Sequence, residues 1–395
     1  MQKVIAFMLI AIVSVGVVYG QEDRLQTFQA NFESANLATK IEILRAADPE
    51  DPVAFAPLYL QALSFVVNNA EALPQQAVMR EVLLVAIDRL VAGSVSDAAT
   101  DLWRLFRLDS ETGSRIRVAQ ALGTLAGDNE FVVESMSEWI RTQSNLLRAG
   151  AQENVDMQVA NAMVLAIGEI GSEISFEPLL DAALVGYPTI VADAIAQVLP
   201  QIGANSVDLA TDAVLARQID QRLPAYLYLK NTGYLSGDEA LELGRRVLGP
   251  AIAGRPQDLV AQQQLRELRY TIVNDLAAGG YGTATREIIR HFNDAVLDFD
   301  RGRTDKTPVL EAIAALGSMG TEAAALRLTE YLELVNTYTE LDRSYDTQVT
   351  LATITNLERL AQPASYNALF IATLLENYPS QVREAAQEAL GSVQR

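Results

Sequence analysis

Apolar residues recur three and four positions apart from Asp23 onward, and the pattern restarts about every 15 to 20 residues. Leu25, Phe28 and Phe32 form the first such stripe, and no sustained alternation with a period of two is found. The stripes are separated by short segments rich in Pro, Gly, Asn and Asp, which are typical helix stop and start signals. The pattern predicts an all-α chain of about eighteen or nineteen helices, each of three to five turns.

Five segments of the chain are similar to one another, which indicates an internal repeat. Each combines Val, spaced Ala, and Leu or Ile followed by Gly, and they lie at 118–127, 159–171, 191–203, 309–320 and 382–391. Small Ala residues let one helix lie close to its neighbours, and Leu and Ile fill a shared core. We expect the Gly residues at the helix ends to adopt the left-handed cap conformation. A second amphipathic helix follows most of the segments, as at 176–184 and 323–334.

The pattern V-x-x-A-x-x-A-L-G-x-x-G followed by a Leu-rich helix resembles HEAT repeats, particularly the short HEAT-like variety of phycocyanobilin lyases. The resemblance is clearest at 114–203, 307–334 and 379–393, and it is degenerate at 21–110 and 204–306, where periodicity alone predicts helix pairs. It implies one HEAT- or armadillo-like α-solenoid over 21–395, a right-handed superhelix of about nine antiparallel helix pairs. A concave face that binds other macromolecules is part of what the resemblance implies.

The N-terminus has the pattern of a secretory signal peptide. Lys3 precedes an apolar run at 4–18, and the small residue Gly20 follows that run. The run is shorter than the roughly 20 residues that a spanning helix needs, so we expect a signal peptide at 1–20, cleaved between Gly20 and Gln21. A retained anchor is the alternative. The cleaved chain is predicted to be periplasmic or secreted, from a bacterium, and without a stable membrane anchor.

The composition limits the chemistry available to the chain. It holds no cysteine and one histidine, which excludes disulfides and thiolate metal sites. A formal net charge of −20 disfavours nucleic acid and anionic membranes and favours basic or mixed-charge protein surfaces as partners. We predict no cofactor and no metal ion. The segment Asp298–Asp305 begins like a calcium loop, but Arg303 replaces its glycine and Val309 its bidentate ligand, so we interpret it as a polar loop between repeats.

His291 is the only candidate general base at neutral pH. No nucleophile motif such as G-x-S-x-G accompanies it, so we interpret it as a residue on a solvent-exposed helix surface, with partner contact as the alternative. Tyr226, Tyr228 and Tyr234 cluster around Lys230 in a segment that looks rich in loops. This cluster has two interpretations, as part of the core or as a partly exposed surface that contacts a partner.

Tyr331, Tyr338 and Tyr345 repeat every seven residues, a spacing that places them on one side of a helix. We interpret them as core or core rim, with an exposed aromatic stripe as the alternative. Arg117 and Arg383 occupy positions where HEAT-like repeats often carry an arginine. The resemblance implies that each pairs with an acidic residue of the adjacent unit and fixes the register between repeats.

Three functions fit these observations. The favoured hypothesis is a non-enzymatic, exported scaffold or adaptor that binds a protein partner through its concave surface, since solenoids provide long surfaces. The alternatives are a lyase-like protein that handles a cofactor or pigment, and an envelope component that associates with itself. The last helix, at 382–391, resembles the first half of a repeat, and its polar outer side makes it suitable as a cap. A monomer is therefore expected.

Overall fold

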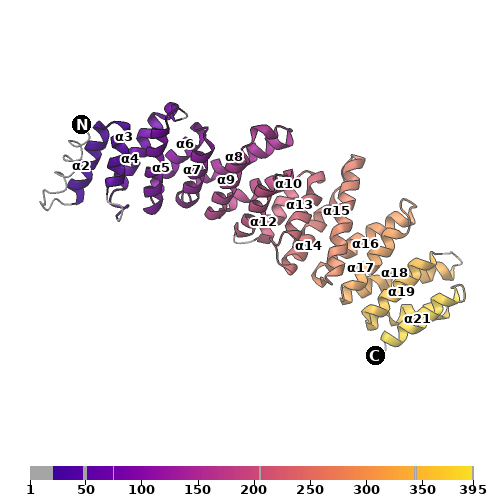
Figure 1. Ribbon diagram of the computed structural model, residues 1–395. Helices are drawn as coiled ribbons and strands as arrows, with labels where there is room; N and C mark the ends of the chain where they lie inside the picture. The colour runs from indigo at the N-terminus through magenta and orange to yellow at the C-terminus, as the bar shows by residue number, and fades with distance from the viewer. Residues whose placement is uncertain are drawn as a thin grey trace. The chain divides into compact units, whose positions relative to one another are not determined.

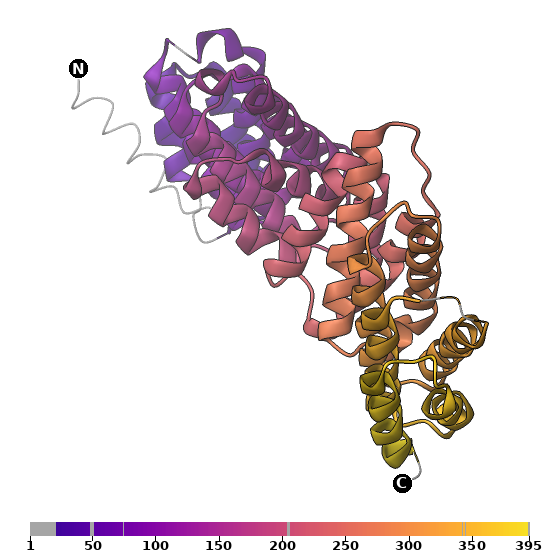
Figure 2. The same cartoon turned by 90° about the vertical axis from the view of Figure 1, so that its right-hand side faces the viewer.

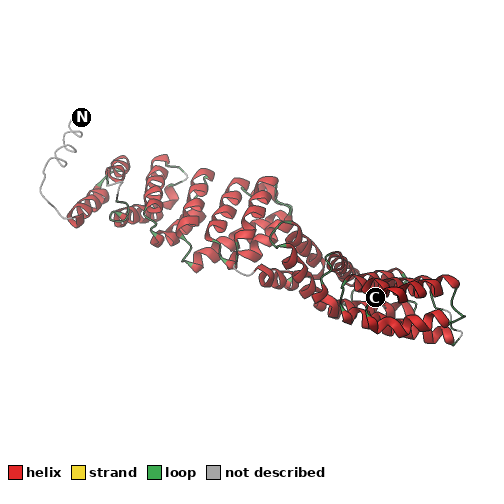
Figure 3. Cartoon of the chain, turned by 90° about the horizontal axis from the view of Figure 1, so that it is seen from below, coloured by secondary structure: helices red, strands yellow, loops and turns green. Residues whose placement is uncertain are grey.

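The computed structural model describes residues 21–47, 51–73, 75–203, 206–341, 343 and 345–393. The chain forms two compact units, Met1–Ala204 and Asn205–Arg395, each of which is described by itself below. Within the described ranges the chain forms twenty α-helices and short 3-10 turns, without any strand (Figure 3). This confirms the all-α prediction. Gly20 and the expected signal peptide lie outside the described residues, while Gln21 begins the first described helix.

The described residues of unit 1 form ten α-helices that follow one another along the chain (Figure 1). Their bounds are α2 Gln21–Ser34, α3 Leu37–Ala46, α4 Ala56–Asn68, α5 Ala77–Ala92, α6 Ala99–Leu108, α7 Thr112–Leu125, α8 Glu130–Arg148, α9 Met157–Ile170, α10 Phe176–Val185 and α11 Thr189–Val198. The weakly patterned segment 21–110 thus contributes five of these helices, α2 to α6, as its periodicity predicts.

Unit 2 contains the other ten described α-helices (Figure 2). Their bounds are α12 Ser206–Ala216, α13 Ile219–Asn231, α14 Gly237–Ala253, α15 Leu259–Ala278, α16 Thr285–Asp300, α17 Thr307–Ser318, α18 Glu322–Glu340, α19 Thr347–Leu360, α20 Tyr366–Leu374 and α21 Ser380–Val393. The degenerate segment 204–306 contributes five of them.

In each unit the helices pack in sequential pairs, α2 with α3 through α10 with α11, and α12 with α13 through α20 with α21. Successive even-numbered helices also contact one another, as do successive odd-numbered helices, so each unit has an even row and an odd row. The five sequence-similar segments all lie in the odd row, on α7, α9, α11, α17 and α21. This arrangement is typical of a helical repeat.

The pairing differs in one respect from the expected order within a repeat. In unit 1 the motif helices α7, α9 and α11 pack against the helix that precedes them, so the motif helix is the second member of its pair. Helix α21 is accordingly the second half of a pair with α20. Its Val382, Ala386 and Leu390 are buried against α19 and α20, and its Glu384 and Glu388 are exposed.

The glycines of the repeat motif serve two purposes, whereas the sequence suggested only helix capping. The first glycine lies inside its helix: a Cβ added to Gly168 of α9 would be 2.5 Å from Cγ2 of Val198 on α11. Gly317 of α17 meets Asn356 of α19 in the same way. These glycines let successive helices of the odd row approach closely. The second glycine has positive φ at Gly171 and Gly320, at 68° and 66°, as the cap prediction requires, whereas Gly127 does not, so the prediction is wrong for that segment.

Equivalent polar contacts recur in both units. The Asp156 carboxylate accepts hydrogen bonds from the backbone N–H groups of Gln158 and Val159 and so caps α9, and its other oxygen accepts from Thr112 Oγ1, at 2.5 Å. Asp346 caps α19 in the same manner and accepts a hydrogen bond from Lys306 Nζ, at 3.1 Å. Each carboxylate therefore starts one helix and ties it to the preceding helix of the odd row.

Hydroxyl pairs join successive helices of the even row. Their oxygens are 2.8 to 3.0 Å apart, in the pairs Ser137 with Ser175, Thr285 with Thr321, and Thr329 with Ser365. Leu, Ile, Val and Ala fill the space between the rows, as the apolar stripes predict.

Candidate functional site

A basic pocket lies in unit 2 between α15, α16 and the segment that follows α14. It has a volume of about 500 Å³. Five arginines line it, and we call it the arginine pocket: Arg255, Arg266, Arg269, Arg301 and Arg303. Two carboxylates, Asp294 and Asp298, also line it. The lining side chains therefore carry three more positive than negative charges, in a chain whose formal net charge is −20.

Helix ends place these arginines around the pocket. Helix α14 ends at Ala253, and Arg255 then donates hydrogen bonds to the carbonyl oxygens of Ile252 and Gly254. Helix α16 ends at Asp300, and Gly302, with φ of 66°, reverses the chain so that Arg303 N–H donates to the Asp298 carbonyl at 2.8 Å. The turn is one that glycine adopts without steric cost.

The carboxylates of the pocket are shared among its arginines. Asp294 Oδ2 lies 3.4 Å from Arg269 Nη2 and 3.5 Å from Arg255 Nη2, and Asp298 Oδ1 lies 3.3 Å from Arg303 Nη1. Among the described residues, no carboxylate comes within 4.0 Å of Arg266 or Arg301. Arginine presents a planar fork of donors that suits carboxylate and phosphate oxygens. The pocket can therefore receive an anion.

His291 lies behind the pocket and is 2% exposed, so the interpretation as a solvent-exposed residue is wrong. Its Nδ1 is 3.3 Å from Arg269 Nη2, and its ring meets Tyr270 edge to face. Burial, together with the nearby Arg269 cation, lowers the pKa of His291 to about 3. The ring is therefore neutral at pH 7, and it accepts a hydrogen bond from Arg269 and holds that guanidinium toward Asp294.

Three residues of the tyrosine cluster, Tyr226, Tyr228 and Lys230, lie on helix α13 rather than in a loop, and only Tyr234 lies in the segment between α13 and α14. Tyr226 and Lys230 of α13 both hold Asp275 of α15, with Tyr226 Oη 2.8 Å from Oδ2 and Lys230 Nζ 2.5 Å from Oδ1. Tyr226 and Tyr234 are buried, while Tyr228 and Lys230 are half-buried. Burial and the Asp275 carboxylate raise the pKa of Tyr226. The cluster ties α13 to α15, and partner contact stays a prediction for its two half-buried residues.

The seven-residue tyrosine line is only partly helical. Helix α18 ends at Glu340, so Tyr345 lies beyond it, yet Tyr331 Oη is 2.6 Å from Tyr345 Oη. Tyr345 in turn donates to Asp300 Oδ1 at 3.0 Å, and its ring stacks with Tyr338. Tyr331 is buried. The turn after α18 brings the third tyrosine back to the other two.

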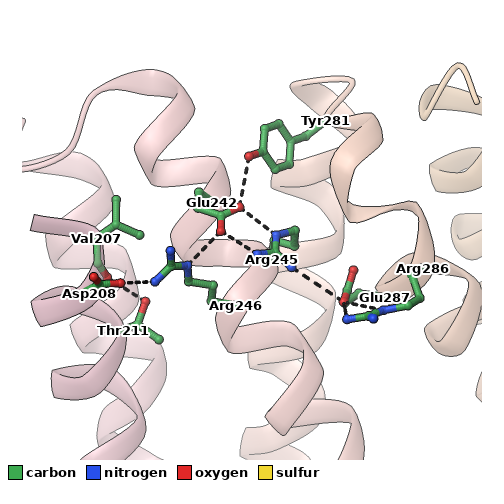
Figure 4. Close-up of polar contacts among 9 residues, drawn as sticks. All are labelled: Val207, Asp208, Thr211, Glu242, Arg245, Arg246, Tyr281, Arg286 and Glu287. Carbon is green, nitrogen blue, oxygen red and sulfur yellow. Dashed lines mark hydrogen bonds and ion pairs between the residues drawn. The ribbon is translucent and has the colours of Figure 1, made fainter. Parts of the chain in front are cut away.

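An ion-pair network runs along the even row of unit 2 (Figure 4). Glu242 accepts hydrogen bonds from Arg245, from Arg246 and from Tyr281 Oη. These bonds, chiefly those from Arg245, lower the pKa of Glu242 to about 2. Arg246 also pairs with Asp208 of α12, and the Arg245 guanidinium reaches toward α16. The network therefore connects three successive helices of the row.

The two register arginines behave differently. Arg117 Nη2 lies 2.5 Å from Asp88 Oδ1 of α5, the preceding helix of the odd row, as the HEAT-like resemblance implies. Within the described part of the chain, Arg383 has no carboxylate within 4.0 Å. The expected polar loop at Asp298–Asp305 is observed as the end of α16 and the turn that follows it.

Sequence reasoning missed the arginine pocket. Its residues come from three segments, and no motif connects them. The sequence does show a local concentration of arginine, since seven arginines lie from position 255 to position 303 of an otherwise acidic chain. The site was unrecognised because helix packing, rather than sequence proximity, brings them together.

The fold defines an all-helical protein whose helices pack in sequential pairs, consistent with a helical repeat. Neither a scan against protein-family models nor a search of curated proteins found a match. Over the residues that the structure describes, no helix is long and apolar enough to cross a membrane. In that same part of the chain, no three or more His, Asp or Glu side chains are grouped so as to hold a metal ion.

Proposed function

We propose that this chain is a non-enzymatic scaffold or adaptor that binds a protein partner over the surface of its paired helices. The observation that carries the proposal is the position of its polar pockets, which lie in grooves between successive helices. In unit 1, a groove of about 500 Å³ on the odd row is lined by Asp88, Arg117, Gln120 and Glu169 of α5, α7 and α9. Stacked repeats offer long grooves of this kind to extended partners.

The environment of the single histidine supports a binding rather than a catalytic role. A general base works best with a pKa near the operating pH and must reach the proton that it removes. Burial and Arg269 lower the pKa of His291 to about 3, and the ring is enclosed behind the arginine pocket. This histidine serves to position Arg269.

The proposal includes the finer expectations from the sequence. The paired rows support a HEAT-like α-solenoid whose concave face holds the partner. The N-terminal pattern supports export to the periplasm or the medium, with cleavage after Gly20. The net charge supports a partner with a basic or mixed-charge surface.

In-cell crosslinking tests the scaffold proposal. The full-length chain, tagged at its C-terminus, would be captured from the native host and its crosslinked proteins identified by mass spectrometry. We expect one reproducible partner, retained by the control Arg148→Glu on the even row and lost with Arg117→Glu in the odd-row groove. The same sample reports whether the chain starts at Gln21. A monomer that retains no protein but binds a pigment or small molecule would overturn the proposal.

A second candidate function, self-association, is favoured by one helix. Several even-row helices have a charged residue at their sixth position, such as Arg104 of α6 and Arg290 of α16. The sixth residue of α20 is instead the apolar Ile371, which is 44% exposed. Helix α20 carries no charged residue, and Phe370 and Leu374 are also exposed on it. An uncharged apolar face is complementary to itself, as a two-fold interface requires.

Light scattering on the purified chain separates the two candidates. A dimer that Ile371→Asp converts to a monomer, while the control Thr337→Asp on α18 does not, would establish self-association. A monomer at all concentrations excludes it.

A further inference from the structure

The arginine pocket lies between two parallel stripes of side chains. On α15, Leu259, Gln262, Arg266 and Arg269 follow a spacing of three, four and three residues, so they share one face. Asp294, Leu297 and Asp298 of α16 and Arg301, the residue that caps its C-terminal end, are spaced three, one and three residues apart, so they also share one face. In each stripe the side chains include both apolar and charged residues.

The length of the α15 stripe fits a short extended peptide. Ten residues separate Leu259 from Arg269, which is about 15 Å along a helix. An extended chain rises about 3.3 Å per residue, so four to five residues span this distance. A single small anion would occupy only part of a pocket of about 500 Å³.

One end of the stripe is apolar and unusually exposed. Leu259 is 78% exposed and Val260 is 63% exposed, and both lie in the first turn of α15. Leu297 of α16, which lines the pocket, is 44% exposed. Exposed large apolar side chains beside unpaired charges are typical of a binding surface.

We propose that the arginine pocket binds an acidic segment of the protein partner. Two or three carboxylates of the segment pair with Arg266, Arg301 and the other arginines, and a large apolar side chain packs on Leu259 and Leu297. Charge complementarity carries the assignment, since the pocket lining has three more positive than negative charges and two of its guanidinium groups have no carboxylate partner among the described residues.

The inference rests on the proposed scaffold function and specifies what the partner presents. Because the rest of the chain is strongly acidic, an entirely acidic partner would be repelled at long range. The partner is therefore a mixed-charge protein that offers an acidic-apolar segment at this pocket.

Fluorescence anisotropy on the purified full-length chain tests the inference. The probe is a labelled peptide, Gly-Leu-Gly-Glu-Asp-Glu-Gly, compared with its reverse sequence, with a Gln/Asn version and with a Leu→Ser version. We expect the Gln/Asn version to bind at least tenfold more weakly and the Leu→Ser version several-fold more weakly, for the better of the two chain directions. Added salt should weaken binding of the acidic peptides.

Variants of the chain locate the site. Arg266→Gln and Arg301→Gln should each weaken binding of the acidic peptide about tenfold, because each removes charged hydrogen bonds. Arg290→Gln is the matched control, since Arg290 is also exposed, lies on α16 and does not line the pocket. Both pocket arginines are exposed side chains without a carboxylate partner among the described residues, so their variants should fold, as circular dichroism would verify.

Three outcomes would overturn the inference: equal binding of the Gln/Asn peptide, loss with Arg290→Gln as large as with the pocket variants, or no peptide binding. Displacement of the peptide by millimolar inorganic phosphate, with no effect of the Leu→Ser change, would reassign the pocket to a small anion. If the crosslinked partner is retained by the pocket variants, the scaffold function stands and this inference fails. If the peptide binds as expected but no partner is captured, the scaffold function fails instead.

Discussion

Replacing Gly317 with alanine should destabilise unit 2, because the added methyl group has no room. Its Cβ would overlap Oδ1 of Asn356 and would lie 2.5 Å from Cγ and 2.8 Å from Cβ of the same residue. Rotation of the Asn356 side chain moves Oδ1 and Cγ but not Cβ, which is fixed to the α19 backbone. The remaining contact is about 0.6 Å shorter than the 3.4 Å at which ordinary van der Waals contact begins. Helices α17 and α19 must therefore separate.

The expected magnitude follows from two opposing effects. Overpacking of a core typically costs about 1–3 kcal/mol, and this site is at the upper end because a backbone must move. Glycine to alanine inside a helix contributes about 0.5–1 kcal/mol of stability in the other direction. We expect a net loss of about 2 kcal/mol, which lowers the melting temperature of a unit of this size by about 4–8 °C.

Gly391→Ala is the matched control for this prediction. Gly391 also follows Ala-Leu in a motif helix of unit 2, but a Cβ there meets nothing within 4 Å. This variant should be more stable than the natural chain by about 0.5–1 kcal/mol. Thermal and urea unfolding followed by far-ultraviolet circular dichroism measures both variants, and adding Asn356→Ala should recover part of the loss in Gly317→Ala. A Gly317→Ala variant as stable as Gly391→Ala would refute the close approach of α17 and α19.

Three further predictions concern one buried titratable residue and two half-buried ion pairs. The pKa of His291 is lowered in the folded state, so below pH 6.5 the unfolded chain takes up a proton that the folded chain excludes. The free energy of unfolding should therefore fall by about 1.4 kcal/mol per pH unit from pH 6.5 toward pH 3. Urea titrations at pH 7 and pH 5 measure this fall, which His291→Gln should remove. The pKa of Glu242 is also lowered, so its stabilisation of the folded chain is present above about pH 4.5 and is lost as the pH falls toward 2. Glu242→Gln should therefore lower the free energy of unfolding by about 2 kcal/mol at pH 7 and by much less at pH 3. An equal loss at both pH values would contradict the ion-pair network. Lys230→Met leaves the Asp275 carboxylate without its cation and should cost about 2 kcal/mol, whereas Tyr226→Phe should cost about 1 kcal/mol; chemical denaturation measures both, and a neutral Lys230→Met would contradict the pairing.

The helices themselves were predictable because their signal is local. Apolar residues three and four positions apart, such as Leu25, Phe28 and Phe32, form one apolar face only if the segment is helical, whatever that face packs against. The Pro, Gly, Asn and Asp residues between such segments mark the helix ends. Even the segments with the weakest repeat pattern proved helical. The order of helices within a pair was not predictable, because contacts on both sides of a motif helix give the same pattern of apolar residues.

The site was less predictable because burial and charge pairing are long-range properties. His291 sits among charged neighbours in the sequence, which suggested a solvent-exposed surface, yet α15 covers it with Arg269 and Tyr270. Tyr226 and Lys230 lie 49 and 45 positions from the Asp275 that they hold. Their roles depend on which helices become neighbours, which a single sequence does not specify.

The glycines inside the motif helices have a consequence for curvature. They lie in the odd row, where Gly123, Gly168 and Gly317 each remove a side chain from a helix–helix contact. When successive helices lie closer together in one of two linked rows than in the other, the double row curves, with the closely spaced row on its concave side. We therefore expect each glycine to contribute one step of bending within its unit. Larger residues at these positions would straighten the unit as well as weaken it, so the groove geometry of the odd row can change through single methyl groups far from any partner.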